Sequence, residues 1–247
     1  MSYPYFFIDG PKREKGEKII IEGRDNNHLK NVLRAEKGDT VVLSGGGNIY
    51  ECRLEMIDKK KSVLIVFKVT EVKIRPYNIT LFQSVLKKNP MELVIQKTTE
   101  IGIDTIIPVF TDRVVIDSKK VTSKIPRWQE IAHQASKQSK RSHIPAIKEP
   151  IAFDDIHRMD FDIFFAPVED QRDDTIDYEK LSDMVKDKSV KKLAYIVGPE
   201  GGFSDKEREL LSRQGISLLN FGSNILRAET AAVYFLSVLD YLLKTRD

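Results

Sequence analysis

The sequence has little of what disulfide-bonded, metal-binding or membrane-spanning proteins need. Its 247 residues include one cysteine, Cys52, which excludes a disulfide scaffold and a cysteine-rich metal site. The four histidines lack ligand spacing of the HxxxH kind, so no metal is expected. The longest nearly apolar run, residues 231–239, is far shorter than the roughly 20 residues that cross a bilayer. The N-terminus, MSYPYFFIDG, has no charged stretch before an apolar one, so a cytoplasmic protein is expected.

Length and composition are those of a globular protein. Hydrophobic residues make up 41% of the chain and charged residues 31%, which excludes a disordered chain. At roughly 100–200 residues per domain, the length predicts one large domain or two small ones. An enzyme or a binding protein therefore remains.

Positive charge is concentrated in parts of the chain. The net charge is only +3, from 40 Lys and Arg against 37 Asp and Glu. Residues 1–77 carry 15 basic and 11 acidic side chains, and residues 119–148 carry eight basic ones against a single acid, Glu130. Such concentration is typical of proteins that bind a phosphate-rich partner, such as a nucleic acid. Lysine-rich surface that contacts only solvent explains it as well, and charge alone does not decide.

Residues 1–77 have the pattern of a small β-barrel. Strands are predicted where β-branched and aromatic residues gather, at 5–8, 18–21, 40–43, 50–56 and 63–69. One short helix is expected between Asp25, as its N-cap, and Arg34. The glycines at 45–47 lack the GxxxxGK[ST] context of a phosphate loop, so we interpret them as a hairpin turn.

After Arg75-Pro76, apolar strands alternate with amphipathic helices. Strands are expected at 79–86, 105–110, 163–166, 193–197 and 216–221. One helix is expected between Asn89, as its N-cap, and Gly102, and further helices at 126–140, 178–185, 205–213 and 229–243. This alternation predicts a mostly parallel sheet covered by helices on both faces.

A first glycine-containing turn, residues 198–202, follows the predicted strand at 193–197. The order IVGPEGGFSDKE places three glycines before Ser204 and Glu207, whose spacing is that of a capping box. Ligands of open α/β sheets bind at the carboxyl ends of strands, and glycines let the backbone approach a ligand closely. Because Pro199 lacks an N–H and Glu200 repels phosphate, the turn suits a ligand with hydroxyls, an amine or a positive centre. A plain strand–helix turn is the alternative.

A second such turn, NFGSNILRAETA at residues 220–231, precedes the very apolar C-terminal helix. Glu229 suits the N-terminus of that helix, whereas a cation such as Arg227 is disfavoured there. The polar residues at this point either cap the helix or serve a bound ligand.

Both turns resemble those of the bacterial 16S ribosomal RNA uridine-N3 methyltransferases, the RsmE family. The similar stretches are GPEGGFSDKE, GSNILRAETA and, upstream, PMELVIQKTTEIGIDTIIPVFTDR. Near the N-terminus, HLKNVLR at 28–34 with GD at 38–39 also resembles the family. The resemblance covers nearly the whole chain, and the two late motifs occur together in the family's order.

The resemblance implies an α/β methyltransferase domain of the SPOUT class, residues 75–247, with a mostly parallel sheet and a C-terminal trefoil knot. A small PUA-like RNA-binding β-barrel, residues 1–74, would precede it. The resemblance also implies a homodimer, S-adenosyl-L-methionine as cofactor, and 16S ribosomal RNA or the small ribosomal subunit as partner. The C-terminal helix favours the dimer, since it carries more apolar surface than one sheet face covers.

The cofactor would lie in the knot, held by the turn after Phe165 and by the two glycine-containing turns. The expected cofactor-binding residues are Ala166, Pro167, Glu169, Val197, Gly198, Pro199, Glu200, Gly201, Gly202, Gly222, Ser223, Ile225, Leu226, Thr230 and Ala231.

Methylation at N3 of uridine requires an in-line approach and loss of the N3 proton, so a base or a stabilising cation is expected. The candidate carboxylates are Glu200 and Glu229, and the candidate cation is Arg227; the sequence does not choose between them. Basic residues expected to contact RNA are Arg13, Arg24, Arg34 and Arg141.

The chain departs from the family pattern at two places. Asn224 stands where relatives often have arginine, with Ala228 where they often have threonine, and Lys137 lies in a segment that is usually closer to EQxxR. Two alternatives to the leading function stay open: a SPOUT enzyme acting on another RNA or atom, and a non-catalytic RNA-binding module. The intact glycines of both turns argue against the second.

Overall fold

The computed structural model describes residues 3–114, 118–158, 161–168, 177–220, 222 and 224–246, with backbone alone at 157 and 158. These residues form two units. The first unit comprises Met1–Ile74 and Ser136–His143, and the second comprises Arg75–Ala135 and Ile144–Asp247. The chain therefore passes from the first unit to the second after Ile74, and the segment Ser136–His143 returns to the first unit.

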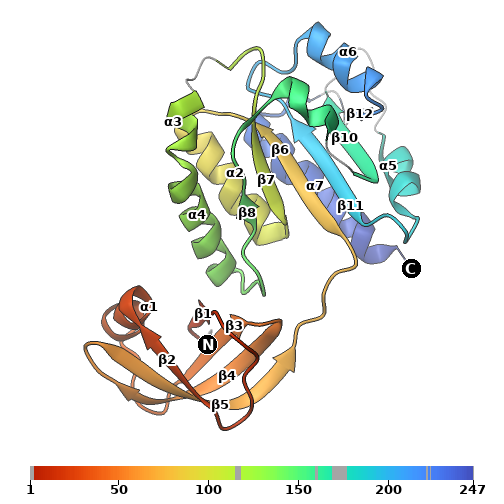
Figure 1. Ribbon diagram of the computed structural model, residues 1–247. Helices are drawn as coiled ribbons and strands as arrows, with labels where there is room; N and C mark the ends of the chain where they lie inside the picture. The colour runs from red at the N-terminus through yellow and green to blue at the C-terminus, as the bar shows by residue number, and fades with distance from the viewer. Residues whose placement is uncertain are drawn as a thin grey trace. The chain divides into compact units, whose positions relative to one another are not determined.

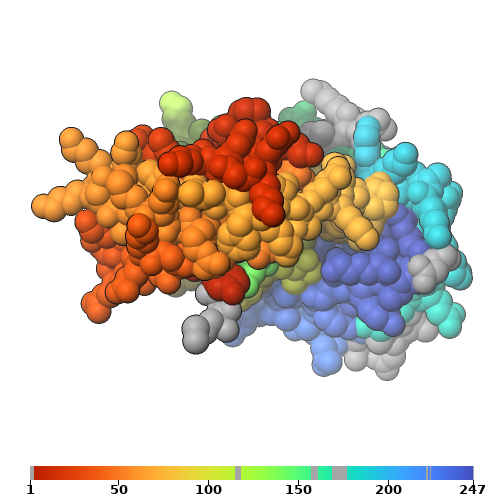
Figure 2. Space-filling model, turned by 90° about the horizontal axis from the view of Figure 1, so that it is seen from below, coloured from red at the N-terminus to blue at the C-terminus, as the bar shows by residue number. Residues whose placement is uncertain are grey.

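A five-stranded sheet builds the first unit, in the order β1-β3-β4-β5-β2 (Figure 1). Its strands are β1 (Tyr5–Phe7), β2 (Lys18–Glu22), β3 (Thr40–Gly45), β4 (Asn48–Ile57) and β5 (Lys61–Glu71). β1 pairs with β3 in parallel, and the other pairs are antiparallel. Inward-facing residues such as Phe6, Leu43 and Leu64 form one core. The long strands β4 and β5, orange in Figure 2, cover much of the visible surface of this unit. The predicted strands are confirmed.

The helix predicted between Asp25 and Arg34 is shorter and differently wound. It consists of α1 (Gly23–Asn27) and a π-helical turn, η1 (His28–Val32). Asp25 is not its N-cap: the helix begins after Glu22, and the Asp25 carboxylate pairs instead with Lys137 at 2.9 Å. The interpretation as a cap was wrong because a partner from distant sequence holds that carboxylate.

The glycines at 45–47 form a two-residue hairpin turn, as predicted. Gly45 pairs with Asn48 across β3 and β4, which leaves Gly46 and Gly47 at the tip. Their φ angles of 56° and 74° lie in the left-handed region, which suits a hairpin turn that follows the twist of the strands.

The segment Ser136–His143 belongs with the first unit, although we expected residues 75–247 to form one domain. The side chain of Lys137 is 11% exposed and pairs with Asp25, and the hydroxyl of Ser44 donates to the carbonyl of Ser142 at 3.0 Å. These contacts join residues about a hundred positions apart, and no local pattern predicts them.

A parallel sheet forms the second unit, in the order β12-β10-β11-β6-β7-β8, with β9 also paired to β7. Its strands are β6 (Asn78–Ser84), β7 (Thr105–Phe110), β8 (Ala146–Ile147), β9 (Ile151–Ala152), β10 (Ile163–Val168), β11 (Lys192–Val197) and β12 (Ser217–Asn220). Every pairing between these strands is parallel, as predicted. The knot that the resemblance implies stays a prediction.

Helices cover both faces of this sheet. They are α2 (Lys88–Ile101), α3 (Ser118–Thr122), α4 (Ile125–Gln138), η2 (Phe153–Arg158), α5 (Tyr178–Val185), α6 (Asp205–Arg213) and α7 (Ala228–Thr245). The helices α2 and α7 lie on the far side of the sheet in Figure 1, and their buried side chains belong to one core. Leu211 of α6 and Phe153 of η2 pack in the core on the opposite face. No helix in the described part of the chain has the length and apolar character needed to cross a membrane.

The N-terminus of α2 differs from the prediction. The helix begins at Lys88 after an extended Lys87, without a side-chain cap, so Asn89 and Pro90 lie inside its first turn. Proline is tolerated there because the first N–H groups of a helix have no intrahelical acceptor. The predicted end is confirmed, since the N–H of Gly102 donates to the carbonyl of Thr98 at 3.0 Å.

Candidate active site

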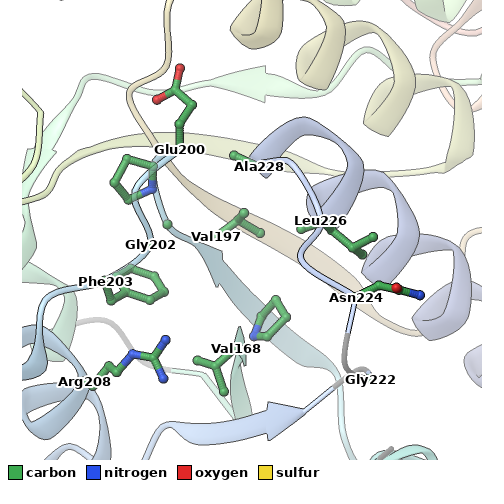
Figure 3. A pocket seen from close by; sticks show the side chains of 14 residues that line it. Val168, Val197, Glu200, Gly202, Phe203, Arg208, Gly222, Asn224, Leu226 and Ala228 are labelled. Carbon is green, nitrogen blue, oxygen red and sulfur yellow. The ribbon is translucent and has the colours of Figure 1, made fainter. Parts of the chain in front are cut away.

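A pocket lies where three neighbouring strands of the second unit end. β12, β10 and β11 run parallel side by side, so the segments after their carboxyl ends meet at one edge. The pocket is bounded by the end of β10, the 198–202 turn after β11, and the segment that leads from β12 into α7 (Figure 3). Its empty volume is about 630 Å³, counting the part open to solvent.

Apolar side chains form most of the pocket wall, and a few polar groups lie among them. The described residues that line it are Pro167, Val168, Val197, Gly198, Pro199, Glu200, Gly202, Phe203, Arg208, Gly222, Asn224, Leu226, Ala228 and Ala231. In Figure 3, Phe203 and Arg208 lie on one side and Leu226 and Asn224 on the other, while the Glu200 carboxylate extends outward from the rim. A mostly apolar cleft with a few placed polar groups is the usual form of a small-molecule site.

The glycines of the 198–202 turn serve different purposes. The turn closes with a hydrogen bond of 2.9 Å from the N–H of Gly202 to the carbonyl of Pro199. Gly202 has φ +69°, which favours glycine. A Cβ on Gly198 would lie 3.4 Å from the ring of Phe203, so a side chain larger than that of alanine would press on the ring. At this position a small residue shapes the pocket wall.

The predicted capping box of α6 is confirmed, and it does more than cap the start of the helix. Ser204 Oγ accepts from the N–H of Glu207 at 3.2 Å, and Glu207 Oε2 accepts from the N–H of Ser204 at 2.7 Å. The second oxygen of Glu207, a residue only 3% exposed, accepts from the N–H of Asp112 at 2.9 Å. The start of α6, which carries Arg208 into the pocket wall, is thereby tied to the loop after β7.

The start of α7 forms another part of the pocket wall. Arg227 is the N-cap of this helix in an extended conformation, and no side-chain hydrogen bond caps it. Ala228 and Ala231 line the pocket, whereas the side chain of Arg227 is exposed. Small residues at these two positions leave room for a ligand beside the first turn of the helix.

The structure brings most of the expected cofactor residues together. Those in the pocket wall are Pro167, Val197, Gly198, Pro199, Glu200, Gly202, Gly222, Leu226 and Ala231. Four others are described but do not line it: Ala166, Gly201, Ile225 and Thr230. Ala166 is buried inside β10, and Ile225 is 63% exposed. Glu169 and Ser223 lie outside the described residues.

Of the three catalytic candidates, only Glu200 lines the pocket, while Arg227 and Glu229 lie at the start of α7 beside it. The four candidate RNA contacts, Arg13, Arg24, Arg34 and Arg141, all belong to the first unit. Arg34 has a left-handed backbone, with φ 53°, and the guanidinium of Arg141 contacts the ring of His143 at 2.7 Å. Their contact with RNA stays a prediction.

Sequence reasoning missed several residues of the pocket wall. Phe203 and Arg208 follow the 198–202 turn, and Val168 ends β10, but none of them belongs to a recognisable spacing. Asn224 was noticed only as a departure from the family pattern. In the described residues, no group of three or more His, Cys, Asp or Glu side chains could hold a metal ion.

Comparison with known families matches both parts of the chain. A model of the RNA methyltransferase domain matches residues 73–240, and a model of the RNA methyltransferase PUA domain matches residues 21–67. The larger match contains every described residue of the pocket.

Individual relatives match along nearly the full chain. Ribosomal RNA small subunit methyltransferase E of Bacillus subtilis (strain 168) is 32% identical over 247 residues, covering 96% of this chain and 95% of the relative. The protein of the same name from Aquifex aeolicus (strain VF5) is 29% identical over 233 residues, covering 92% and 96%. A solved structure of a putative methyltransferase from Legionella pneumophila, with S-adenosylmethionine bound, is 30% identical with a TM-score of 0.81, covering 98% of each chain.

Proposed function

Because the chain belongs to the ribosomal RNA small subunit methyltransferase E family, we propose that it transfers a methyl group from S-adenosylmethionine to N3 of a uridine in 16S ribosomal RNA. The pocket at the ends of β10, β11 and β12 is the observation that carries the proposal, since it lies inside the matched methyltransferase domain. The substrate places the reaction in the cytoplasm, where ribosomes are assembled.

The residues that line the pocket suit the chemical groups of S-adenosylmethionine. The apolar wall of Val168, Phe203 and Leu226 suits the adenine ring, and Arg208 can pair with the methionine carboxylate. When bound, the cofactor supplies a methyl group on a positively charged sulfur.

The residues of this chain bind the donor, orient the base and receive its proton. N3 lies on the pairing edge of uracil, so the target nucleotide must be unpaired or turned out of a helix. Glu200 is the described carboxylate that lines the pocket, and from its rim position it accepts the N3 proton as the base approaches the methyl group. Glu229, the second residue of α7, does not line the pocket and serves as the control. Glu200→Gln should lower kcat by roughly a hundredfold or more without weakening cofactor binding. Glu229→Gln should leave kcat nearly unchanged.

A homodimer completes the proposal. Tyr234 and Tyr241, seven residues apart on α7, expose 36% and 66% of their surface, and Leu93 of α2 exposes 42%. Exposed apolar side chains on two helices that pack together suit a two-fold interface, in which each residue is used twice. Sedimentation of the unmodified protein should give a dimer at micromolar concentration, and a monomer would contradict this part of the proposal.

The deciding experiment maps methyl groups on ribosomal RNA. Small-subunit RNA from a strain that lacks the gene should lack one methyl group, which mass mapping locates on a uridine base. The intact gene should restore it, and a gene encoding Leu226→Asp, which places a charge in the apolar pocket wall, should not. A methyl group missing from a ribose or from another RNA would show that a different SPOUT activity is correct. Calorimetry that detects no S-adenosylmethionine binding would indicate a non-catalytic RNA-binding protein.

A further inference from the structure

A cation outside the pocket wall lies directly against the 198–202 turn. Arg113 belongs to the loop after β7 and is exposed. A Cβ built on Gly201 would lie 3.2 Å from Cδ of Arg113 and 3.4 Å from its Nη1. Gly201 therefore leaves room for the Arg113 side chain, and neither residue is among those that line the pocket.

The loop that carries Arg113 is held in place by the start of α6. The N–H of Asp112 donates to Glu207 at 2.9 Å, and the hydroxyl of Ser204 donates to the carboxylate of Asp112 at 2.9 Å. Glu207 is buried and also accepts from the N–H of Ser204. These bonds fix the backbone on the N-terminal side of Arg113 relative to the turn that forms the pocket.

The guanidinium of Arg113 makes no ion pair or hydrogen bond with the described residues. Within the described ranges, no carboxylate pairs with it and no oxygen accepts a hydrogen bond from it. The carboxylate of neighbouring Asp112 is occupied by Ser204. Thr111, two residues before Arg113 in the same loop, is 5% exposed, and its hydroxyl has no hydrogen-bond partner in the described chain.

We propose that Arg113 binds a backbone phosphate of the target nucleotide and so positions the uridine against the methyl donor. The turn then separates two ligands: the donor on the side of Glu200 and Gly202, and the RNA backbone on the side of Gly201. A guanidinium suits this task because its donors match two phosphate oxygens at once. The inference rests on the proposed function and adds a positioning residue to it.

The first test compares two arginines that differ in placement. Small ribosomal subunits from a strain lacking the gene serve as substrate. Arg113→Ala should raise KM about tenfold with a much smaller change in kcat, and lower the slope of log affinity against log salt by about 0.7–0.9. Arg213→Ala is the matched control, since it removes the same charge from an exposed pair with Glu209 on α6. Arg113→Lys keeps the charge and should restore most of the salt slope but only part of the affinity.

The second test uses the space at Gly201. Gly201→Val should displace the Arg113 side chain, raise KM for the ribosomal substrate and leave S-adenosylmethionine affinity, measured by calorimetry, within about twofold of the unmodified protein. In the Arg113→Ala background, the same substitution should have little further effect. That non-additivity distinguishes displacement of Arg113 from general damage to the turn.

Three outcomes would overturn the inference. In one, Arg113→Ala behaves like Arg213→Ala; in another, Arg113→Ala weakens S-adenosylmethionine binding, which would assign Arg113 to the donor. In the third, the effects of Gly201→Val and Arg113→Ala on KM simply add. Failure of the proposed function looks different, because the unmodified protein would then fail to methylate the subunits.

Discussion

Two glycine-rich turns of this protein have similar composition and different roles. The 45–47 turn joins β3 to β4 in the first unit, and the 198–202 turn forms one wall of the pocket in the second. At the hairpin tip, the backbone favours glycine at both positions, because Gly46 and Gly47 have positive φ, whereas in the 198–202 turn only Gly202 does. In the 198–202 turn, Gly198 and Gly201 instead leave room for the side chains of Phe203 and Arg113.

The difference shows that glycine density alone does not identify a ligand site. Both turns attract attention in the sequence, and only the tertiary neighbours separate them. A substitution in the first turn should therefore act on stability, and one in the second on binding. Two natural probes report the units separately, since Cys52 is buried in the first and Trp128, the single tryptophan, is buried in the second.

The largest effect is expected at Gly45. A Cβ there would overlap the carbonyl oxygen of Ile8 and lie 2.8 Å from Cγ1 of that residue. Backbone cannot move aside cheaply, so Gly45→Ala should destabilise the first unit by about 3 kcal/mol. Burial raises the pKa of Cys52 to about 12, so its thiol should react at neutral pH only when the first unit opens. Gly45→Ala should speed that reaction while Trp128 fluorescence stays native, and unchanged thiol protection would contradict the prediction.

A somewhat smaller loss is expected at Lys137, the residue that ties the later segment to the first unit. Its ammonium pairs with Asp25 and lies 4.1 Å from the centre of the Phe6 ring. Lys137→Ala should destabilise the first unit by about 2 kcal/mol, because it leaves the half-buried Asp25 unpaired. Urea unfolding followed by Cys52 reactivity measures this loss. Lys18→Ala, which breaks an exposed pair with Glu55 in the same unit, is the control and should change stability by less than about 0.5 kcal/mol.

In the 198–202 turn, Gly198→Val should affect the donor rather than the fold. Its added methyl groups would press on the ring of Phe203 and move it within the pocket wall. We expect S-adenosylmethionine affinity to fall about tenfold, or about 1.4 kcal/mol, as measured by calorimetry. Gly198→Ala places only a Cβ at ordinary contact distance and should bind nearly normally. Equal losses in both variants would show that the ring is not the cause.

The smallest effect is expected at Gly46, at the hairpin tip. Its φ of 56° is strained for alanine, so Gly46→Ala should destabilise the first unit by about 1 kcal/mol. Gly46→Asn should cost less, because asparagine tolerates the left-handed region. Thermal unfolding of the two variants measures the difference. Equal stability of the alanine and asparagine variants would show that the positive φ of Gly46 is not what favours glycine at the hairpin tip.

Local patterns predicted most elements of both units. Alternating or continuous apolar runs located the long strands, and the capping box of Ser204 and Glu207 located the start of α6. The elements that were missed are short: β8 and β9 have two residues each and α3 has five. Such lengths contain too few residues for a periodic signal. Caps were less reliable, since neither Asp25 nor Asn89 caps the helix predicted for it.

For the candidate site, the turns that follow β10, β11 and β12 were predictable because parallel strands direct their carboxyl ends to one edge. Which side chains face the pocket was not. Arg208 enters the wall because buried Glu207 orients the start of α6, and Arg113 contacts Gly201 because the same carboxylate holds the preceding Asp112.

The sequence by itself determined the alternation of strands and helices, the strand-rich first part, the two glycine-containing turns and the likeness to a methyltransferase family, because these depend on periodicity and short motifs. Only the tertiary structure decided that Ser136–His143 returns to the first unit, that Gly201 makes room for Arg113, and that Arg227 stays outside the pocket wall. Those facts depend on contacts between residues tens to a hundred positions apart. Such contacts exist only once the chain has packed, when steric fit and hydrogen-bond partners select one neighbour among many.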